Sequence, residues 1–210
     1  MKILVIGGSG RVAASLVTDL VAAGHDVYVG SRHVDTLPSG EHIHPLTLDL
    51  TSSKEALSQA IPQVDIMYFV AGSRGHDLLQ VDAFGPVKMM QIAQAQSIKR
   101  FIMLSSVYSL TPSHWDQVPA SLGDYQIAKF FADTYLMTNT DLTYTILQAT
   151  ALTETAGTGK ISLTDQRGTE NTISDVAATL AALLEYPNTE NKVITMSNGQ
   201  TPINEALRQV

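Results

Sequence analysis

The chain begins Met1-Lys2-Ile3-Leu4-Val5-Ile6-Gly7-Gly8-Ser9-Gly10-Arg11-Val12-Ala13, and this stretch decides the fold. The all-apolar run Ile3 to Ile6 predicts a parallel strand that is buried on both faces. The glycines after it allow a tight turn into a helix that we expect from Arg11 to Ala23. Free N–H groups and the positive dipole end at the start of such a helix bind a pyrophosphate. Because Gly7, Gly10 and Ala13 match a G-x-x-G-x-x-G/A turn, the stretch predicts a dinucleotide site.

Strand-like and helix-like segments alternate along most of the chain, which is typical of a parallel sheet covered by helices on both faces. We expect strands at Lys2 to Ile6, Asp26 to Gly30, Ile43 to Asp49, Ile66 to Val70, Phe101 to Leu104 and Thr143 to Gln148. We expect the connecting helices at Arg11 to Ala23, Ser53 to Ala60, Leu78 to Gln96 and Tyr125 to Thr138, with Ser52 or Ser53 as the N-cap of the second. Right-handed crossovers between these strands predict an α/β fold with a doubly wound parallel sheet.

The pattern changes after Gln148. Thr155 to Gly168 is rich in Gly and Thr, and the alternation in Lys160-Ile161-Ser162-Leu163 predicts a small hairpin. We expect a helix from Ser174, as its N-cap, to Tyr186, then a strand at Lys192 to Met196 and a terminal helix at Ile203 to Arg208. Because no linker or repeat divides the chain, we expect one domain over residues 1–210, in which residues 149–210 form a small C-terminal elaboration on the substrate side.

The composition excludes several classes of protein. The net charge of −7 and the absence of a Lys/Arg cluster argue against a nucleic-acid partner. With no cysteine, the chain has no disulfide and no thiolate metal site. The apolar run at the start is too short for an export signal, and no later run is long enough to cross a membrane. His42 and His44 share a face of an extended segment without a third ligand nearby, so we expect no metal site. These features favour a cytoplasmic protein that acts on a small molecule.

The second expected strand ends in Val29-Gly30-Ser31-Arg32, where an NAD-specific site usually has an acidic residue for the ribose hydroxyl groups. Arg32 and Arg11 instead offer two guanidinium groups that suit a 2′-phosphate, which favours NADP(H) over NAD(H). The alternative is that Arg32 is a solvated loop charge.

Two further strand ends belong to the expected ligand edge of the sheet. Asp49 follows the third strand, where it can accept from an adenine amino group while Leu50 packs on the ring, or can cap Thr51 to Ser53. Ala71-Gly72-Ser73 follows the fourth strand, where small residues let a cofactor ribose approach the backbone. A plain turn explains the same three residues.

Tyr125 and Lys129 are spaced i,i+4, so both side chains project from one face of a helix. A lysine ammonium near a phenol favours the phenolate, which makes tyrosine a usable acid/base for an alcohol or carbonyl. Ser105-Ser106 follows a predicted strand and places a hydroxyl at the same edge, where it can steady a substrate oxygen. Such a tyrosine–lysine pair also occurs by chance on helix surfaces. Trp115, in the loop before this helix, either faces the substrate or anchors the loop.

In these motifs and their order the chain resembles the short-chain dehydrogenase/reductase superfamily, especially its atypical, NmrA-like and flavin-reductase-like single-domain members. The resembling motifs are Gly7-x-x-Gly10-x-x-Ala13, Asp49-Leu50, Ala71-Gly72, Val81 to Gly85, Phe101 to Ser106, Tyr125-x-x-x-Lys129 and Asp141 to Leu147. The resemblance implies a Rossmann fold, a catalytic Tyr125, a Lys129 that binds the nicotinamide ribose, and a substrate-orienting serine, for which we favour Ser106. Departures include Asp82, where relatives often carry Asn, and Gln148-Ala149-Thr150 in place of Arg-Pro-Gly.

We therefore expect an NADP(H)-dependent reductase that transfers a hydride to a small carbonyl, quinone or similar acceptor. Alternatives are a cofactor-binding redox sensor without turnover, or an epimerase or isomerase with a tightly bound cofactor. The residues that we expect to contact the cofactor are Gly7, Ser9, Gly10, Arg11, Val12, Arg32, Asp49, Leu50, Ala71, Gly72, Ser73, Ser105, Tyr125, Lys129 and Gln148.

Overall fold

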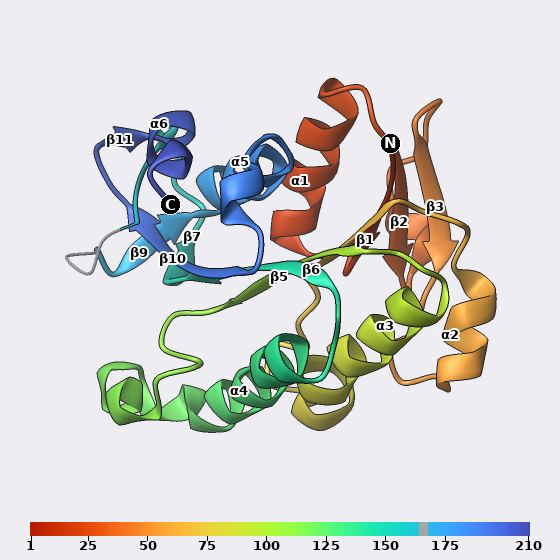
Figure 1. Ribbon diagram of the computed structural model, residues 1–210, viewed down its shortest axis with the longest axis horizontal. Helices are drawn as coiled ribbons and strands as arrows, with labels where there is room; N and C mark the ends of the chain where they lie inside the picture. The colour runs from red at the N-terminus through yellow and green to blue at the C-terminus, as the bar shows by residue number, and fades with distance from the viewer. Residues whose placement is uncertain (164–167) are drawn as a thin grey trace.

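A computed structural model describes residues 1–163 and 168–210 and shows a central sheet with helices on both faces (Figure 1). The described strands of this sheet have the order β11-β8-β10-β6-β5-β4-β1-β2-β3. Seven of them are parallel: β1 (Lys2–Ile6), β2 (Asp26–Ser31), β3 (Ile43–Thr47), β4 (Ile66–Phe69), β5 (Arg100–Ser106), β6 (Thr143–Ala149) and β10 (Lys192–Asn198). The chain has the predicted doubly wound Rossmann fold.

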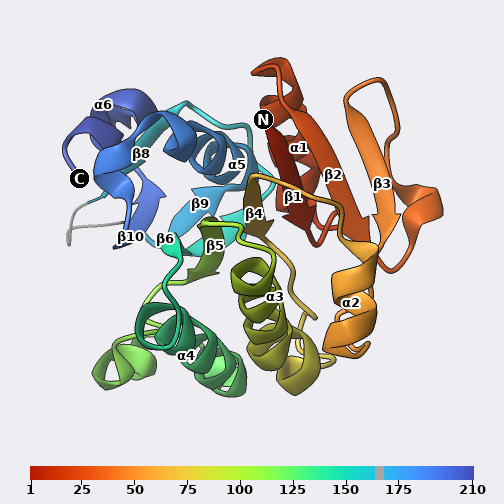
Figure 2. The same cartoon turned by 45° about the vertical axis from the view of Figure 1, so that its right-hand side comes forward.

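The helices form two layers (Figure 2). On one side of the sheet lie α1 (Arg11–Ala22), α5 (Ile173–Ala182) and α6 (Ile203–Arg208), and on the other lie α2 (Lys54–Ala60), α3 (Phe84–Ala95) and α4 (Gly123–Thr138). A hydrophobic core lies on each face of the sheet. Alternate residues of β1 pack into these two cores, because successive side chains of a strand point to opposite faces. Ile3 and Val5 pack with α1 and α5, whereas Leu4 and Ile6 pack with the opposite layer. This explains why the strand is apolar throughout.

Several local expectations are confirmed and others are wrong. Ser53 caps α2, since its Oγ accepts from the N–H of Ala56 at 3.2 Å. Ser174 was expected to cap α5, but Thr172 does so by accepting from the N–H of Asp175 at 3.1 Å. The expected helix from Leu78 to Gln96 is divided into a π-helical segment, Leu78–Ala83, and α3.

The expected hairpin around Lys160 to Leu163 is not what the described residues form. Strand β8 (Lys160–Ser162) is antiparallel to β10 and to β11 (Thr201–Pro202), both far along the chain. Residues 164–167 of the Gly/Thr-rich segment lie outside the described residues. Strands β7 (Ala151–Thr153) and β9 (Glu170–Thr172) pair in a separate small sheet. No helix within the described ranges is both long and apolar enough to span a bilayer.

The order of the strands fixes where a ligand can bind. From β1 the chain adds β2 and β3 on one side, then returns to place β4 on the other side of β1. At this switch point the connections after β1 and β4 leave on opposite faces of the sheet, which opens a crevice at the carboxyl ends of the strands. The glycine turn lies at that crevice.

Candidate functional site

The glycine turn that follows β1 has the geometry of an anion site. Gly7 has a φ of +98°, and a Cβ on it would lie 2.5 Å from the Cα of Ala71, so only glycine fits there. Gly10 is the N-cap of α1 and no side chain caps that helix end. The N–H groups of the first turn are thus left for a ligand, and the helix dipole favours a negative one. Val12 is buried in the core, so its backbone alone faces the turn.

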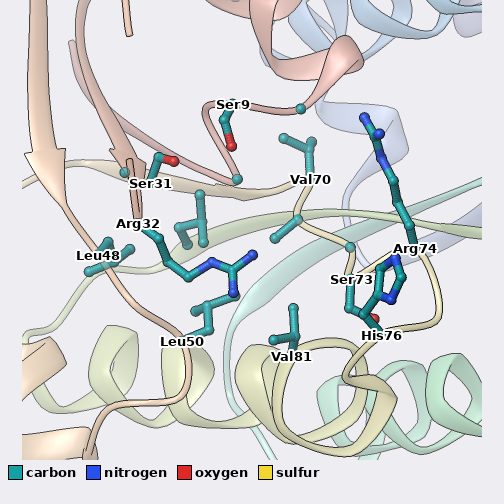
Figure 3. Close-up of a pocket in the computed structure, with 16 residues that line it drawn as sticks. Ser9, Ser31, Arg32, Leu48, Leu50, Val70, Ser73, Arg74, His76 and Val81 are labelled. Atoms are coloured by element: carbon teal, nitrogen blue, oxygen red, sulfur yellow. The ribbon is translucent and has the colours of Figure 1, made fainter. Parts of the chain in front are cut away.

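A cavity of about 350 Å³ opens at the switch point; we call it the switch-point cavity (Figure 3). Its lining comes from the ends of β1, β2 and β4, the segments after β1, β2, β3 and β4, and the π-helical segment: Ile6, Gly7, Ser9, Gly10, Gly30, Ser31, Arg32, Leu48, Leu50, Val70, Ala71, Gly72, Ser73, Arg74, His76 and Val81. Arg32 and Arg74 stand on opposite sides of it, with His76 beside Arg74. The described lining holds no carboxylate, although the whole chain has a net charge of −7. The cavity suits an anionic ligand.

Arg74 and His76 were not predicted from the sequence. They lie in the loop after β4, where Arg74 and Gly75 both have left-handed backbones, with φ of 55° and 83°. The buried carboxylate of Asp82 holds the start of this loop by accepting from the N–H of Ser73 at 3.1 Å. The Oγ of Ser73 is buried with no hydrogen-bond partner in the described structure. A hydroxyl in this state fits a site whose ligand supplies the missing bond.

Asp49 and Leu50 have separate roles. The Oδ1 of Asp49 accepts from both the N–H and the Oγ1 of Thr51 at 2.9 Å, so the structure shows the capping role that we left open. The hydrogen bond from the Thr51 N–H is the main cause that lowers the pKa of Asp49, and the charge of Arg32 adds to it. Leu50, which lines the cavity, is the one of the pair that faces a ligand.

A second cavity, of about 610 Å³, lies beside the first and is called the tyrosine cavity. Its described lining is Arg11, Leu104, Ser105, Ser106, Val107, Tyr108, Gln117, Val118, Pro119, Leu122, Tyr125, Ala149, Thr150, Ala151, Leu152, Gly168 and Thr169. The consecutive residues Gly10 and Arg11 line one cavity each, so both cavities are lined by residues around the start of α1.

The sequence-predicted catalytic residues come together at the tyrosine cavity. The Nζ of Lys129 lies 5.6 Å from the ring centroid of Tyr125 and 3.3 Å from the carbonyl oxygen of Leu104, to which it donates. Lys129 is only 2% exposed, so it is not a surface partner of Tyr125. The Oγ of Ser105 donates to the buried carboxylate of Asp133 at 2.6 Å. Ser106 forms no side-chain hydrogen bond in the described part of the chain, which leaves its hydroxyl free to meet a ligand.

Of the expected cofactor contacts, Val12, Asp49, Lys129 and Gln148 line neither cavity, and Arg11 lines a different cavity from Arg32. Arg11 does not join Arg32; it lines the tyrosine cavity and pairs with Glu154 at 3.0 Å, with exposed fractions of 49% and 72% for the two side chains. Such an exposed pair is weak, so Arg11 can exchange this partner for a ligand. Gln148 is buried, and its amide is used within the protein by Ser109 and Thr195. Neither cavity includes Gln148 in its lining.

Trp115 anchors its loop and does not line the tyrosine cavity. Its indole N–H donates to the carbonyl oxygen of Tyr108 at 2.8 Å, and its ring meets Phe130 edge to face. His42 pairs with Asp26 at 2.9 Å on the surface. Across residues 1–163 and 168–210 no group of three His, Asp or Glu side chains is placed to hold a metal ion.

Known proteins resemble this chain in sequence and in fold. An oxidoreductase, ylbE from Lactococcus lactis, has a solved structure with 41% identity and a TM-score of 0.94, covering 100% of this chain and 96% of its own. YhfK of Bacillus subtilis, described as an uncharacterized sugar epimerase, is 33% identical over the full length of both chains. A short-chain dehydrogenase/reductase from Veillonella parvula, solved with NADP, shares the fold at 16% identity and a TM-score of 0.77, over 95% of each chain. Residues 7–187 match the family described as NAD(P)H-binding, and this chain belongs to that family.

Proposed function

We propose that this protein is an NADP(H)-dependent reductase that acts on a small carbonyl or quinone. One observation carries the proposal: Tyr125 and Ser106 face the same cavity, and the buried ammonium of Lys129 lies beneath Tyr125. A tyrosine with a neighbouring lysine and a free serine hydroxyl can protonate and orient one substrate oxygen.

In this proposal the residues of the switch-point cavity bind the cofactor, and those of the tyrosine cavity bind and protonate the substrate. When bound, the cofactor supplies or accepts a hydride. The uncapped start of α1 holds its pyrophosphate, and Arg32 pairs with its 2′-phosphate, for which a planar guanidinium is well suited. In the tyrosine cavity the hydroxyl of Tyr125 donates a proton to the substrate oxygen while Ser106 donates a hydrogen bond to it. The charge of Lys129 stabilises the phenolate that remains.

The described lining of the tyrosine cavity combines apolar and polar side chains. Leu104, Val107, Val118, Pro119, Leu122 and Leu152 provide apolar surface that suits the ring or chain of a small carbonyl or quinone. The description of YhfK as a sugar epimerase supports a second candidate, an epimerase that retains its cofactor. An epimerase would consume no cofactor overall, which separates the two candidates by experiment.

The test is reduction of menadione, a quinone, by NADPH in the wild type and in Tyr125→Phe. We expect kcat to fall about 100-fold or more in the variant, because general acid catalysis is lost. The Kd of NADPH, measured by fluorescence titration, should change less than about twofold. Tyr135 is on the same helix as Tyr125, and its hydroxyl accepts a hydrogen bond from Gln91 of α3, so Tyr135→Phe makes the same chemical change outside the cavity and serves as the matched control.

Unchanged turnover in Tyr125→Phe would exclude Tyr125 as the proton donor. NADPH binding without reduction of menadione or of a panel of aldehydes and ketones would favour the sensor or the epimerase over the reductase. Copurified cofactor that is never consumed would select the epimerase.

A further inference from the structure

A chain of buried polar side chains lies beneath Lys129 and reaches three strands of the sheet. Asp133 follows Lys129 by one helical turn on α4 and is fully buried. Its Oδ2 accepts from Ser105 of β5 at 2.6 Å and from Ser109 at 2.5 Å. Ser109 in turn accepts from the amide of Gln148 on β6 at 2.8 Å, and the amide oxygen of Gln148 accepts from Thr195 of β10 at 3.0 Å.

Lys129 is the charged group that faces Asp133 within the described structure. The other neighbours are neutral: Ser105 from β5, Ser109 from the turn after β5, and Gln148 from β6. The second carboxylate oxygen of Asp133 is buried with no hydrogen-bond partner there. Lys129, for its part, has one recorded hydrogen bond, to Leu104. Burial favours the protonated form of Asp133, and the charge of Lys129 favours its carboxylate form.

We propose that Asp133 is a positioning residue of the tyrosine cavity. Its negative charge lies one helical turn from Lys129, whose ammonium lies beside the ring of Tyr125, and its oxygen holds the hydroxyl of Ser105 inward so that Ser106 is the serine left free toward the substrate. This inference rests on the proposed function of Tyr125 and Lys129.

Burial of the carboxylate has a cost in stability. Burial raises the pKa of Asp133 from 3.8 to about 6, although hydrogen bonds from Ser105 and Ser109 and the charge of Lys129 act in the opposite direction. The folded chain thus binds a proton more readily than the unfolded chain. The contribution of Asp133 to stability is greatest below pH 3.8 and is lost as the pH rises to about 6. At neutral pH the fold carries a buried charge at a net cost, as functional sites often do.

Asp133→Asn tests the inference, with Asp141→Asn as a control that makes the same chemical change at an exposed position. Without cofactor, urea unfolding should show Asp133→Asn to be at least as stable as the wild type at about pH 8, with the difference shrinking toward about pH 4. The kcat with menadione should fall about tenfold or more, as for a lost charge interaction. In the wild type, kcat should fall at acidic pH with a midpoint near pH 6, and this fall should be absent from the variant.

Cofactor affinity gives an independent measurement. The Kd of NADPH should rise in Asp133→Asn at neutral pH, because the negative charge one helical turn from Lys129 is lost and Lys129 is the residue expected to bind the ribose. The 2′-phosphate of NADPH titrates in the same pH range, so NADH is titrated in parallel. Ser109→Ala provides a second variant: it removes one donor to the carboxylate and should shift the acidic limb of the wild-type profile to higher pH.

The outcomes separate this inference from the proposed function. A loss of stability in Asp133→Asn at pH 8, or an unchanged pH profile and NADPH affinity, would overturn the positioning role. If the wild type binds neither NADPH nor NADH, the proposed function fails and the positioning role with it. If the wild type binds NADPH without turnover, the affinity and stability measurements still decide whether Asp133 positions Lys129.

Discussion

Two arginines on opposite sides of the switch-point cavity have different expected ligands. Arg32 follows β2, where the adenosine ribose of a dinucleotide lies, and Arg74 follows β4, across from it (Figure 3). Arg32→Ala should raise the Kd of NADPH about 10-fold or more, since a charge-assisted hydrogen bond contributes about 1.5–3 kcal/mol, and should leave the Kd of NADH nearly unchanged. Arg74→Ala should weaken both cofactors by the same factor, because both carry the pyrophosphate.

Calorimetric titration of both cofactors into each variant measures these effects. Arg208→Ala, an exposed change on α6, is the control for a lost positive charge. If Arg74→Ala weakens the binding of NADPH alone, Arg74 contacts the 2′-phosphate and not the pyrophosphate. If Arg32→Ala weakens both equally, Arg32 does not discriminate between them.

Residues with local signals were placed correctly from the sequence, and residues that depend on distant partners were not. The glycine turn and the Tyr125–Lys129 spacing are readable because helix and turn geometry relate near neighbours. Asp133 gives no such signal: in the sequence it is one acidic residue of a helix, and its serine partners lie 28 and 24 positions away. The guanidinium of Arg11 in the glycine turn led to the prediction that it contacts the 2′-phosphate. Its partner Glu154 lies 143 positions along the chain, and no local pattern indicates that pairing.

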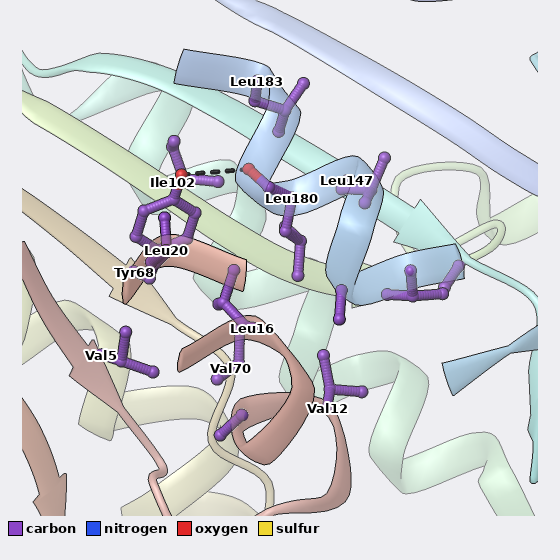
Figure 4. Packing of buried hydrophobic residues seen from close by; sticks show 14 of the residues in the cluster. Val5, Val12, Leu16, Leu20, Tyr68, Val70, Ile102, Leu147, Leu180 and Leu183 are labelled. Atoms are coloured by element: carbon purple, nitrogen blue, oxygen red, sulfur yellow. Dashed lines mark hydrogen bonds between the residues drawn. The ribbon is translucent and has the colours of Figure 1, made fainter. Parts of the chain in front are cut away.

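At the scale of elements, a single hydroxyl ties α5 to the sheet. Tyr68 of β4 is fully buried and donates to the carbonyl oxygen of Leu180 at 3.0 Å (Figure 4). Burial raises the pKa of Tyr68, so it remains a donor throughout the usual pH range. Tyr68→Phe should lower the free energy of unfolding by about 1 kcal/mol and the Tm by about 2–4 °C.

Urea and thermal unfolding measure this change. Tyr28→Phe is the control, because the described structure records no hydrogen bond for the hydroxyl of Tyr28. A loss in Tyr68→Phe no larger than in Tyr28→Phe would show that packing alone holds α5.

The strands and helices of the parallel layer were predicted within a few residues, since apolar runs and periodicity are strong over that length. After Gln148, α5, β10 and α6 were also predicted within a few residues, but the partners of β8 were not. Strand β8 pairs with β10 and β11, which lie at least 35 residues away in the sequence. A strand of three residues is too short for its pattern to indicate such distant partners. Thr172 rather than Ser174 caps α5, because the chain enters the helix directly from β9. Thr172 and Ser174 are both good N-cap residues, so the sequence alone does not decide which of them begins the helix.

At the scale of the whole molecule, the two cavities draw on most strands of the parallel layer. The switch-point cavity is lined by the ends of β1, β2 and β4 and the segment after β3, and the tyrosine cavity by β5, β6, β7 and the residues just before β9. A ligand that occupies both binds the folded chain and not the unfolded one, so it must stabilise the entire fold. At a free concentration of about 100 times Kd the gain is about 2.7 kcal/mol.

For a chain of 210 residues that gain corresponds to a rise in Tm of about 5–10 °C. At equal concentrations NADPH should therefore raise the Tm more than NADH, by an amount that grows with the logarithm of concentration. Thermal unfolding of the full chain over a concentration series of each cofactor measures this. Equal shifts would defeat the argument from the 2′-phosphate, and the absence of any shift would defeat the reading of the two cavities as one cofactor site. A larger shift with NADPH that disappears in Arg32→Ala would connect the stability of the whole fold to one guanidinium at the switch point.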